Sequence, residues 1–492
     1  MRFLGDSPGV SGATLLERIG RNTLAQLLSL GVTFADRLIG AGLLVRAWGP
    51  EQFGEWALLF SGACLILLGE AGCGTVLGNL WQRARGDAVG RVCGLAASVA
   101  MVQAAVLAGL AGLWLAWSGL RGEEGAAFAI LALALVLLAA RGGVGQFLRA
   151  KGEFAAGALL EALPTLATVA GTAGVALAGG SIVALAAVYL VAQLVFGWGV
   201  TLLLLKRRFA DFTLRPVRPS RDEVGQFARQ LRWVTLGQNA PLAWTQAPIL
   251  LLGAFGTSGV ALAGFLLVRT LVGLARQLAS VLAVAAGVEL AREDLAHGRI
   301  GAVTRVLCAL SAALGSGVIV WGPALLGLWT GEAELFDQAV AAWLVAGSLT
   351  ACLGAPLAQT LLYSGAPRAP ALALVGQLGA GLVGAAVLLP GFGIAGAAAG
   401  LAMGEVVGLI LLLRMTSTPL ISLLPALVAL GTSLGWNALV AETASAVLGD
   451  WPGIAAWAVF GLLLSLVLAL PPSVRRRVLT RRAQMRSAAG SA

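Results

Sequence analysis

Stretches of about 20 apolar residues follow one another along almost the whole of this 492-residue chain. A stretch of that length lets an α-helix cross the hydrocarbon core of a bilayer, which is about 30 Å thick. We place fourteen such stretches, at 24–45, 55–78, 92–117, 126–148, 155–178, 182–205, 233–254, 260–288, 303–325, 339–363, 370–389, 393–413, 420–440 and 453–470. The connections between them are short, so the sequence excludes a large soluble domain and predicts a polytopic membrane protein.

The apolar stretches predict helices and not the strands of a β-barrel. A barrel strand needs only 9 to 11 residues and alternates apolar with polar positions, and neither property is present here. The chain is 59% hydrophobic and 11% charged, and its 67 glycines suit close packing of helices in a membrane. We therefore predict an all-α fold with about 14 transmembrane helices.

The basic residues predict the orientation of the chain in the membrane, because cytoplasmic loops carry an excess of Lys and Arg. With the N-terminus in the cytoplasm, 28 of the 33 basic residues fall on the cytoplasmic side and only Arg46 and Arg121 on the other. Three more lie inside predicted spans, namely Arg37, Arg269 and Arg276. We expect a multi-pass protein of the cytoplasmic (inner) membrane with both termini in the cytoplasm. The net charge of +10 then reflects topology and contact with membrane lipids, and no nucleic acid partner is expected.

The start of the chain predicts that its first span is retained. The first apolar run has full span length and lacks the small-residue cleavage pattern of a signal peptide. The five cysteines lie within or at the edges of spans without a CxxC pair, which is typical of small buried apolar residues.

Several classes of catalytic protein are disfavoured. The one histidine, His297, falls in a cytoplasmic loop, which excludes a His-based metal site or general base inside the membrane. No Walker-type phosphate loop is present, and we expect no catalytic residues, no metal site and no cofactor. The longest outer loop, about 326–338, is too small for the active site of a membrane glycosyltransferase or polymerase. We therefore expect a protein that is not an enzyme.

Polar residues on the first span are the strongest functional signal. Gln26, Thr33 and Arg37 share one helical stripe, together with Asn22 and Ser29, and Asp36 lies at its edge. A charged residue at the centre of a membrane helix costs about 2.5–3.5 kcal/mol on insertion scales, so it marks a functional site by default. This stripe should face a wet cavity, unless Asp36 and Arg37 pair with other helices.

Two later spans carry a similar pattern. Gln238 and Asn239 lie on a span that Pro241 and Pro248 interrupt. In the next span Arg269 and Arg276 are seven residues apart and project from nearly the same face. Guanidinium groups in such a cavity would bind phosphate by charge and by forked hydrogen bonds.

Other readings of the charged residues stay open. Arg276 could instead extend toward the cytoplasm. Glu70, Glu161 and Glu405 are further intramembrane candidates, and the last two are equally typical of interhelical ion pairs. A structural scaffold would not explain arginines on matched helix faces.

Four short motifs resemble those of polysaccharide and oligosaccharide flippases (O-antigen flippase-like), a family of the multidrug, oligosaccharidyl-lipid and polysaccharide exporter superfamily. Residues 46–54, Arg-Ala-Trp-Gly-Pro-Glu-Gln-Phe-Gly, are similar to the family's connection between the first two spans, with Trp48 in place of Leu. Residues 70–75, Glu-Ala-Gly-Cys-Gly-Thr, resemble the end of its second span. Residues 362–368 and 390–398 are similar to its elements around the eleventh span.

The resemblance implies two six-helix lobes in parallel repeat. We expect an N-terminal lobe at 1–205, a basic cytoplasmic linker at 206–232, a C-terminal lobe at 233–414, two additional helices at 415–470 and a basic tail at 471–492. Trp48-Gly49 and Gly54 also resemble Phe255-Gly256 and Gly264, which would be a trace of the repeat.

The resemblance further implies alternating access around a cavity lined by the first, second, seventh and eighth spans. The substrate would be a lipid-linked oligosaccharide on a polyprenyl diphosphate, flipped for cell-surface polysaccharide biosynthesis such as lipopolysaccharide O-antigen or exopolysaccharide. A polysaccharide polymerase and glycosyltransferases would be its partners. Arg37, Arg269 and Arg276 would hold the diphosphate, and the predicted sugar contacts are Gln26, Thr33, Gln238, Asn239 and Trp244. Asp36 and Glu70 are candidates for ion coupling. The alternative is a cation-coupled multidrug exporter of the same superfamily, with Asp36 as the coupling site.

Overall fold

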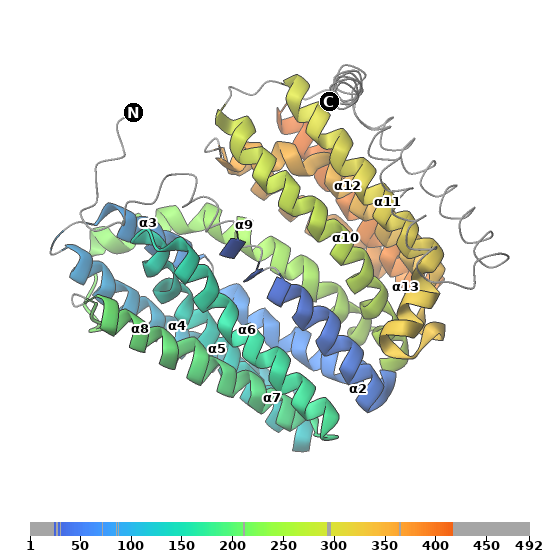
Figure 1. Cartoon of the computed structure of the whole chain (residues 1–492), viewed down its shortest axis with the longest axis horizontal. Coiled ribbons are helices and arrows are strands. Elements are labelled where there is room, and N and C mark those ends of the chain that lie inside the picture. Colours follow the sequence, from blue (N-terminus) through green and yellow to red (C-terminus); the bar gives the residue numbers. More distant parts are fainter. Residues whose placement is uncertain are drawn as a thin grey trace, which may run out of the picture. The chain divides into compact units, whose positions relative to one another are not determined.

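A computed structural model describes residues 24–25, 28–29 and 31–416, apart from 71, 85, 87, 210–211, 293–296 and 364–365. Every regular element within these residues is a helix, as Figure 1 shows, which confirms the predicted all-α fold. The predicted spans 420–440 and 453–470 and the basic tail lie outside the described residues.

The described residues form two compact units. Unit 1 consists of the residues up to Ala47 and of Gly62–Thr235, and unit 2 of Trp48–Ser61 and the residues from Leu236 on. The short segment Trp48–Ser61 therefore groups with the second unit, although its neighbours on both sides in the chain belong to the first.

Unit 1 is built around one buried helix, α5 (Gly122–Ala150), which packs against α3, α4, α6 and α7. Apolar side chains such as Phe128, Leu131 and Phe147 are almost fully buried along it. The other helices of unit 1 are η1 (Asp36–Gly40), the ends of α2 (Ala41–Cys64), η2 (Leu65–Glu70), α3 (Cys73–Arg83), α4 (Ala88–Ser118), α6 (Phe154–Leu177), α7 (Ile182–Val191), η3 (Ala192–Val200), α8 (Thr201–Arg208) and the start of α9 (Arg221–Ala254).

Unit 2 is organised around α12 (Gln338–Tyr363), which packs against α10 (Gly259–Arg292), α11 (His297–Thr330) and α13 (Arg368–Thr416). The remaining elements are the middle of α2, most of α9 and the short 3-10 helix η4 (Ala333–Leu335). Leu252, Phe265 and Ala398 lie in one of its buried apolar clusters.

Two long stretches of helix exceed the length of a single membrane crossing. The stretch Gly31–Arg83 has 53 residues and α13 has 49, which at about 1.5 Å per residue is more than twice the hydrocarbon thickness. Each bends at a glycine outside the helical region of backbone space: Gly49 has φ 81° and Gly393 has φ 59°. These breaks lie where the sequence predicts connections between spans.

Within the described residues, eight helices are long and apolar enough to cross a membrane, and Gly259–Leu274 is a shorter apolar one. The protein is therefore a multi-pass membrane protein. All five cysteines are buried and form no disulfide within the described residues, and their burial agrees with their positions in the predicted spans.

The two glycines that the sequence suggests as repeat partners share one backbone feature, and the repeat itself stays a prediction. Gly49 and Gly256, which the motif comparison pairs, both have positive φ angles, 81° and 71°. Only glycine adopts this region readily. Gly54, five residues after Gly49, lies very close to the main chain of α10. A Cβ at Gly54 would lie 2.1 Å from the carbonyl oxygen of Gly259. The motif Gly-Pro-Glu-x-Phe-Gly thus supplies both a helix break and a surface that α10 can touch.

Within unit 1, residues 212–223 of the predicted linker are bonded to α4. The main-chain N–H of Val217 donates to the carbonyl of Gly94 on α4 (3.4 Å), and the Ser98 hydroxyl donates to the Val217 carbonyl (2.7 Å). Arg91 of α4 forms a two-pronged hydrogen-bonded ion pair with Glu223 (2.7 Å). These bonds hold the extended residues 212–220 against α4, and α9 begins directly after them.

Candidate substrate-binding site

Arg269 of α10 is fixed by a proline kink in α9. Pro248 has no N–H, so the carbonyl of Trp244 one turn earlier lacks its helical donor. The Arg269 guanidinium donates to that carbonyl at 2.6 Å and to the carbonyl of Thr245 at 2.8 Å. Because carbonyls are neutral acceptors, they orient the guanidinium without cancelling its charge.

Arg276 lies seven residues further along α10, about 10 Å from Arg269. It forms an ion pair with Glu405 of α13. The Glu405 side chain is only 4% exposed, against 37% for Arg276, and a buried carboxylate of this kind is costly without a partner. The sequence left open whether Glu405 is a functional intramembrane residue or part of an interhelical ion pair, and the structure shows the ion pair.

These three side chains form a charged cluster inside unit 2, which we call the α10 arginine cluster: Arg269, Arg276 and Glu405. Two guanidinium groups and one carboxylate give it a formal charge of +1. Such a cluster is suited to an anionic ligand, since charge-assisted hydrogen bonds to phosphate are among the strongest that side chains form. Sequence reasoning found both arginines but could not assign the proline-kink carbonyls as acceptors.

The predicted sugar contacts of α9 differ in their surroundings. The Trp244 ring packs against α13, where a Cβ on Gly381 would lie 2.5 Å from the ring. Asn239 is half-buried, and the side chain of Gln238 lies outside what the structure describes. Their contacts with sugars stay predictions.

In unit 1, Asp36 and Arg37 begin a π-helix, η1, that interrupts the first predicted span. Single turns of π-helix inside α-helices are frequent at functional sites. Asp36 is half-buried and Arg37 is exposed. Thr33 donates its hydroxyl to the carbonyl of Ser29 (3.1 Å), and Gln26 lies outside the described residues.

Glu70 has a structural role at the start of α3. Its carboxylate accepts hydrogen bonds from the main-chain N–H groups of Gly72 and Gly74, both at 2.8 Å. These are donors that a helix leaves unsatisfied at its first turn. The second predicted span is therefore broken after Glu70, a feature that hydropathy did not predict. Ion coupling at Asp36 or Glu70 stays a prediction.

Arg141, which the distribution of basic residues assigns to the cytoplasmic side, is a buried residue of unit 1. The structure places it inside α5, 6% exposed, with its guanidinium donating to the carbonyl of Gly197 in the π-helix η3 (3.4 Å). The predicted span 126–148 already contained the residue, which was the signal that could have found it. Its neighbour Arg149 forms an ion pair with Glu161 of α6, so Glu161 also has the interhelical role that its position allowed.

No protein-family model and no curated protein sequence matches this chain. Solved structures do match its fold. A structure of the lipid II flippase MurJ in an inward closed conformation is 13% identical, with a TM-score of 0.72, and the match covers 92% of this chain and all of that one.

Two multidrug transporters match less closely. A MATE family transporter of the MOP superfamily in an inward-facing conformation is 14% identical with a TM-score of 0.60, covering 85% of this chain and 98% of that one. A second MATE multidrug transporter, solved as a complex with a small molecule, is 14% identical with a TM-score of 0.53, covering 84% and 98%. The chain therefore shares the fold of these solved transporters, one of which is described as a member of the MOP superfamily that the sequence motifs resemble.

Proposed function

We propose that the protein is a transporter that moves a polyprenyl-diphosphate-linked oligosaccharide across the cytoplasmic membrane by alternating access, for the assembly of cell-surface polysaccharide. The observation that carries the proposal is the α10 arginine cluster. Its formal charge of +1 inside a membrane-spanning unit suits a diphosphate, and the planar guanidinium of Arg269 is held in place by main-chain carbonyls.

The fold supports the same substrate class. The MurJ structure, described as a lipid II flippase, covers more of this chain than either MATE structure. Arg37 of unit 1 stays a predicted phosphate contact. An inside-negative membrane potential would assist outward movement of the anionic headgroup by about 2.3 kcal/mol per charge per 100 mV. The oligosaccharide would be made by glycosyltransferases on the cytoplasmic side and passed to a polymerase outside.

The alternative is a cation-coupled exporter of drugs, and the half-buried Asp36 in the π-helix η1 is the observation in its favour. The MATE structures share this fold. A net positive cluster in unit 2 disfavours cationic drugs, because like charges would have to share a low-dielectric site.

The test must separate substrate binding from the structural role of Arg269. Pro248→Ala supplies the N–H that the Trp244 carbonyl lacks, so the double variant Arg269→Ala/Pro248→Ala removes the charge while keeping that carbonyl bonded. In cells that depend on this chain, the double variant should accumulate lipid-linked precursor and lose surface glycan, and Pro248→Ala alone should not. Arg37→Ala should act in the same direction.

Normal export by the double variant at a normal protein level would contradict a phosphate-binding role for Arg269. Loss of drug resistance in Asp36→Asn, with normal glycan export in every arginine variant, would favour the alternative.

A further inference from the structure

A groove in unit 1 is lined by none of the predicted substrate contacts. It has a volume of about 340 Å³ and is lined by eight residues: Leu148, Ala156, Leu159, Leu160, Leu163, Val200, Leu204 and Arg208. Small-molecule sites begin at about 300 Å³. The groove is therefore large enough to hold part of a ligand.

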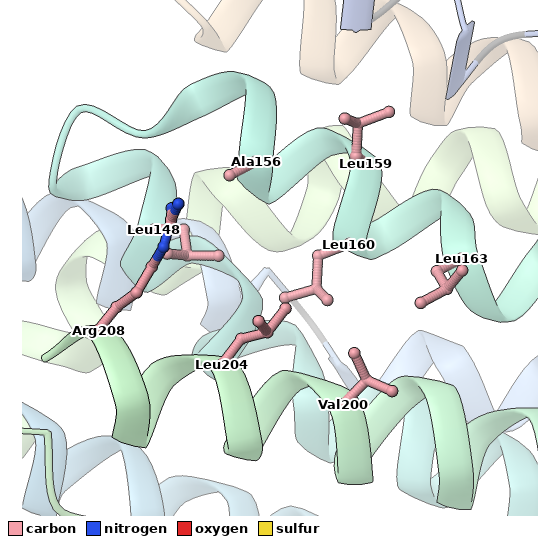
Figure 2. A pocket seen from close by; sticks show the side chains of 8 residues that line it. All are labelled: Leu148, Ala156, Leu159, Leu160, Leu163, Val200, Leu204 and Arg208. Carbon is pink, nitrogen blue, oxygen red and sulfur yellow. The ribbon is translucent and has the colours of Figure 1, made fainter.

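The lining comes from two helical stripes that face each other. On α6, Ala156, Leu159, Leu160 and Leu163 recur at helical spacing, and on η3 and α8 Val200, Leu204 and Arg208 are four residues apart. In Figure 2 the side chains of Leu160 and Leu204 point toward one another.

The groove is open along its side. Leu159 is 48% and Leu204 39% exposed, so the surrounding lipid can reach them. An apolar groove open to a bilayer is filled by an acyl chain, and dispersion contacts with the groove walls, more than the hydrophobic effect, hold that chain there.

One end of the groove is basic. Arg208 closes the last turn of α8 and extends toward the turn between α5 and α6, where it forms an ion pair with Glu153 (Figure 2). The chain segments that meet at this end, 149–153 and 206–208, carry five basic residues and one acidic residue, Glu153, and Arg149 pairs with Glu161 of α6: the basic residues are Arg149, Lys151, Lys206, Arg207 and Arg208. The Arg208 side chain is 55% exposed, so its remaining N–H donors can reach a headgroup.

We propose that this groove binds one anionic glycerophospholipid from the leaflet on the basic side of the protein. An acyl chain lies between α6 and α8, and the phosphate accepts hydrogen bonds from Arg208. An exposed ion pair such as Arg208–Glu153 contributes little by itself, so a phosphate can share the guanidinium at small cost. Basic pockets between membrane helices recognise anionic headgroups in this way.

The apolar groove and the charged end make separate contributions. The groove accepts a chain from any phospholipid, whereas the surplus of basic groups favours a net negative headgroup. Each Lys or Arg near the headgroup raises the affinity for an anionic lipid about fivefold over that for a neutral lipid. The site should therefore discriminate by headgroup charge and saturate at one lipid.

The experiment uses the full-length protein in detergent and native mass spectrometry, with phosphatidylglycerol and phosphatidylcholine of identical chains as probes. The unmodified protein should retain one phosphatidylglycerol at about a fivefold lower lipid concentration than phosphatidylcholine. Arg208→Gln should abolish that preference, and Arg207→Gln, next in the chain but outside the groove, should keep more of it. Leu204→Trp, which fills the groove, should lower retention of both lipids, whereas Leu203→Trp should not.

Equal retention of the two lipids by the unmodified protein would overturn the proposal. It would equally fail if Arg208→Gln and Arg207→Gln weakened the preference alike, because the basic end would then act only as a diffuse charged surface. Unchanged retention in Leu204→Trp, with the fold verified by its thermal transition, would show that the chain binds elsewhere.

Discussion

The guanidinium of Arg269 donates a hydrogen bond of 2.6 Å to the main-chain carbonyl of Trp244, the carbonyl that Pro248 deprives of its helical donor. A kink in one helix thereby fixes the charged side chain of the next. The same arginine is thus a packing element and the principal candidate for phosphate binding. Its two roles make different predictions for substitutions.

The structural role predicts coupling between Arg269 and Pro248. Arg269→Ala should destabilise the protein by about 0.5–2 kcal/mol, the range for buried hydrogen bonds between membrane helices. In a Pro248→Ala background the same substitution should cost less, because residue 248 then donates to the Trp244 carbonyl itself. Thermal unfolding of the four proteins in detergent measures this difference. An identical loss in both backgrounds would mean that the carbonyl bond contributes nothing to stability.

The ion pair Arg276–Glu405 predicts an unequal set of single substitutions. Arg276→Leu leaves a carboxylate that is only 4% exposed without its partner and should cost about 3 kcal/mol or more. Glu405→Leu should cost less, since Arg276 is 37% exposed and its long side chain can reach a more polar layer. The double substitution should be milder than Arg276→Leu alone. Losses in thermal stability that simply add would argue against a buried pair.

The close approach of Gly54 to Gly259 predicts a steric effect. Because a Cβ at position 54 would lie 2.1 Å from a main-chain oxygen, Gly54→Ala should force the two helices apart at a cost of about 1–3 kcal/mol. Gly273→Ala is the control: among the described residues nothing lies within 4 Å of a Cβ placed there. Detergent-solubilised Gly54→Ala should melt below the unmodified protein and Gly273→Ala should not. A stable Gly54→Ala would show that this contact opens freely.

The linker predicts a pH dependence through Glu223. Hydrogen bonds from Arg91 and from the Ser220 main chain lower the pKa of Glu223 from 4.5 to about 2. A lowered pKa in the folded state means that the ion pair stabilises docking fully above about pH 4.5 and is lost as the pH falls toward 2. Hydrogen exchange of residues 212–220, corrected for intrinsic rates, should be constant from pH 8 to 5 and rise below 4.5.

Glu223→Gln supplies the control for this pH dependence. It should expose residues 212–220 to exchange at pH 7 to a similar extent as acid does in the unmodified protein, and it should show little further change on acidification. Protection that declines already between pH 8 and 6 would implicate a different group.

Much of the fold could be predicted because the bilayer imposes a fixed length on apolar helices. The breaks at Gly49 and Gly393 were visible as Gly and Pro near the boundary between two apolar runs. These features depend on local sequence and on the solvent, so no tertiary information is needed to find them.

The site was less predictable because its details depend on partners distant in sequence. Nothing near Arg269 indicates that a kink 21 residues earlier offers it carbonyls. The π-helix at Asp36 and the break after Glu70 leave hydropathy unchanged. The guanidinium of Arg141 donates to the carbonyl of Gly197 in η3, a partner 56 residues away that the local sequence does not indicate.

The central claim is that the charge of Arg269 binds a diphosphate, and a binding measurement tests it most directly. A synthetic polyprenyl-diphosphate disaccharide would be titrated into purified Pro248→Ala and Arg269→Ala/Pro248→Ala proteins, which differ only in the guanidinium. We expect the double variant to bind with a Kd about 10- to 100-fold weaker, because a hydrogen bond to a charged group contributes about that factor to affinity. Equal dissociation constants for the two proteins, or binding of a cationic dye by both and of the diphosphate by neither, would contradict it.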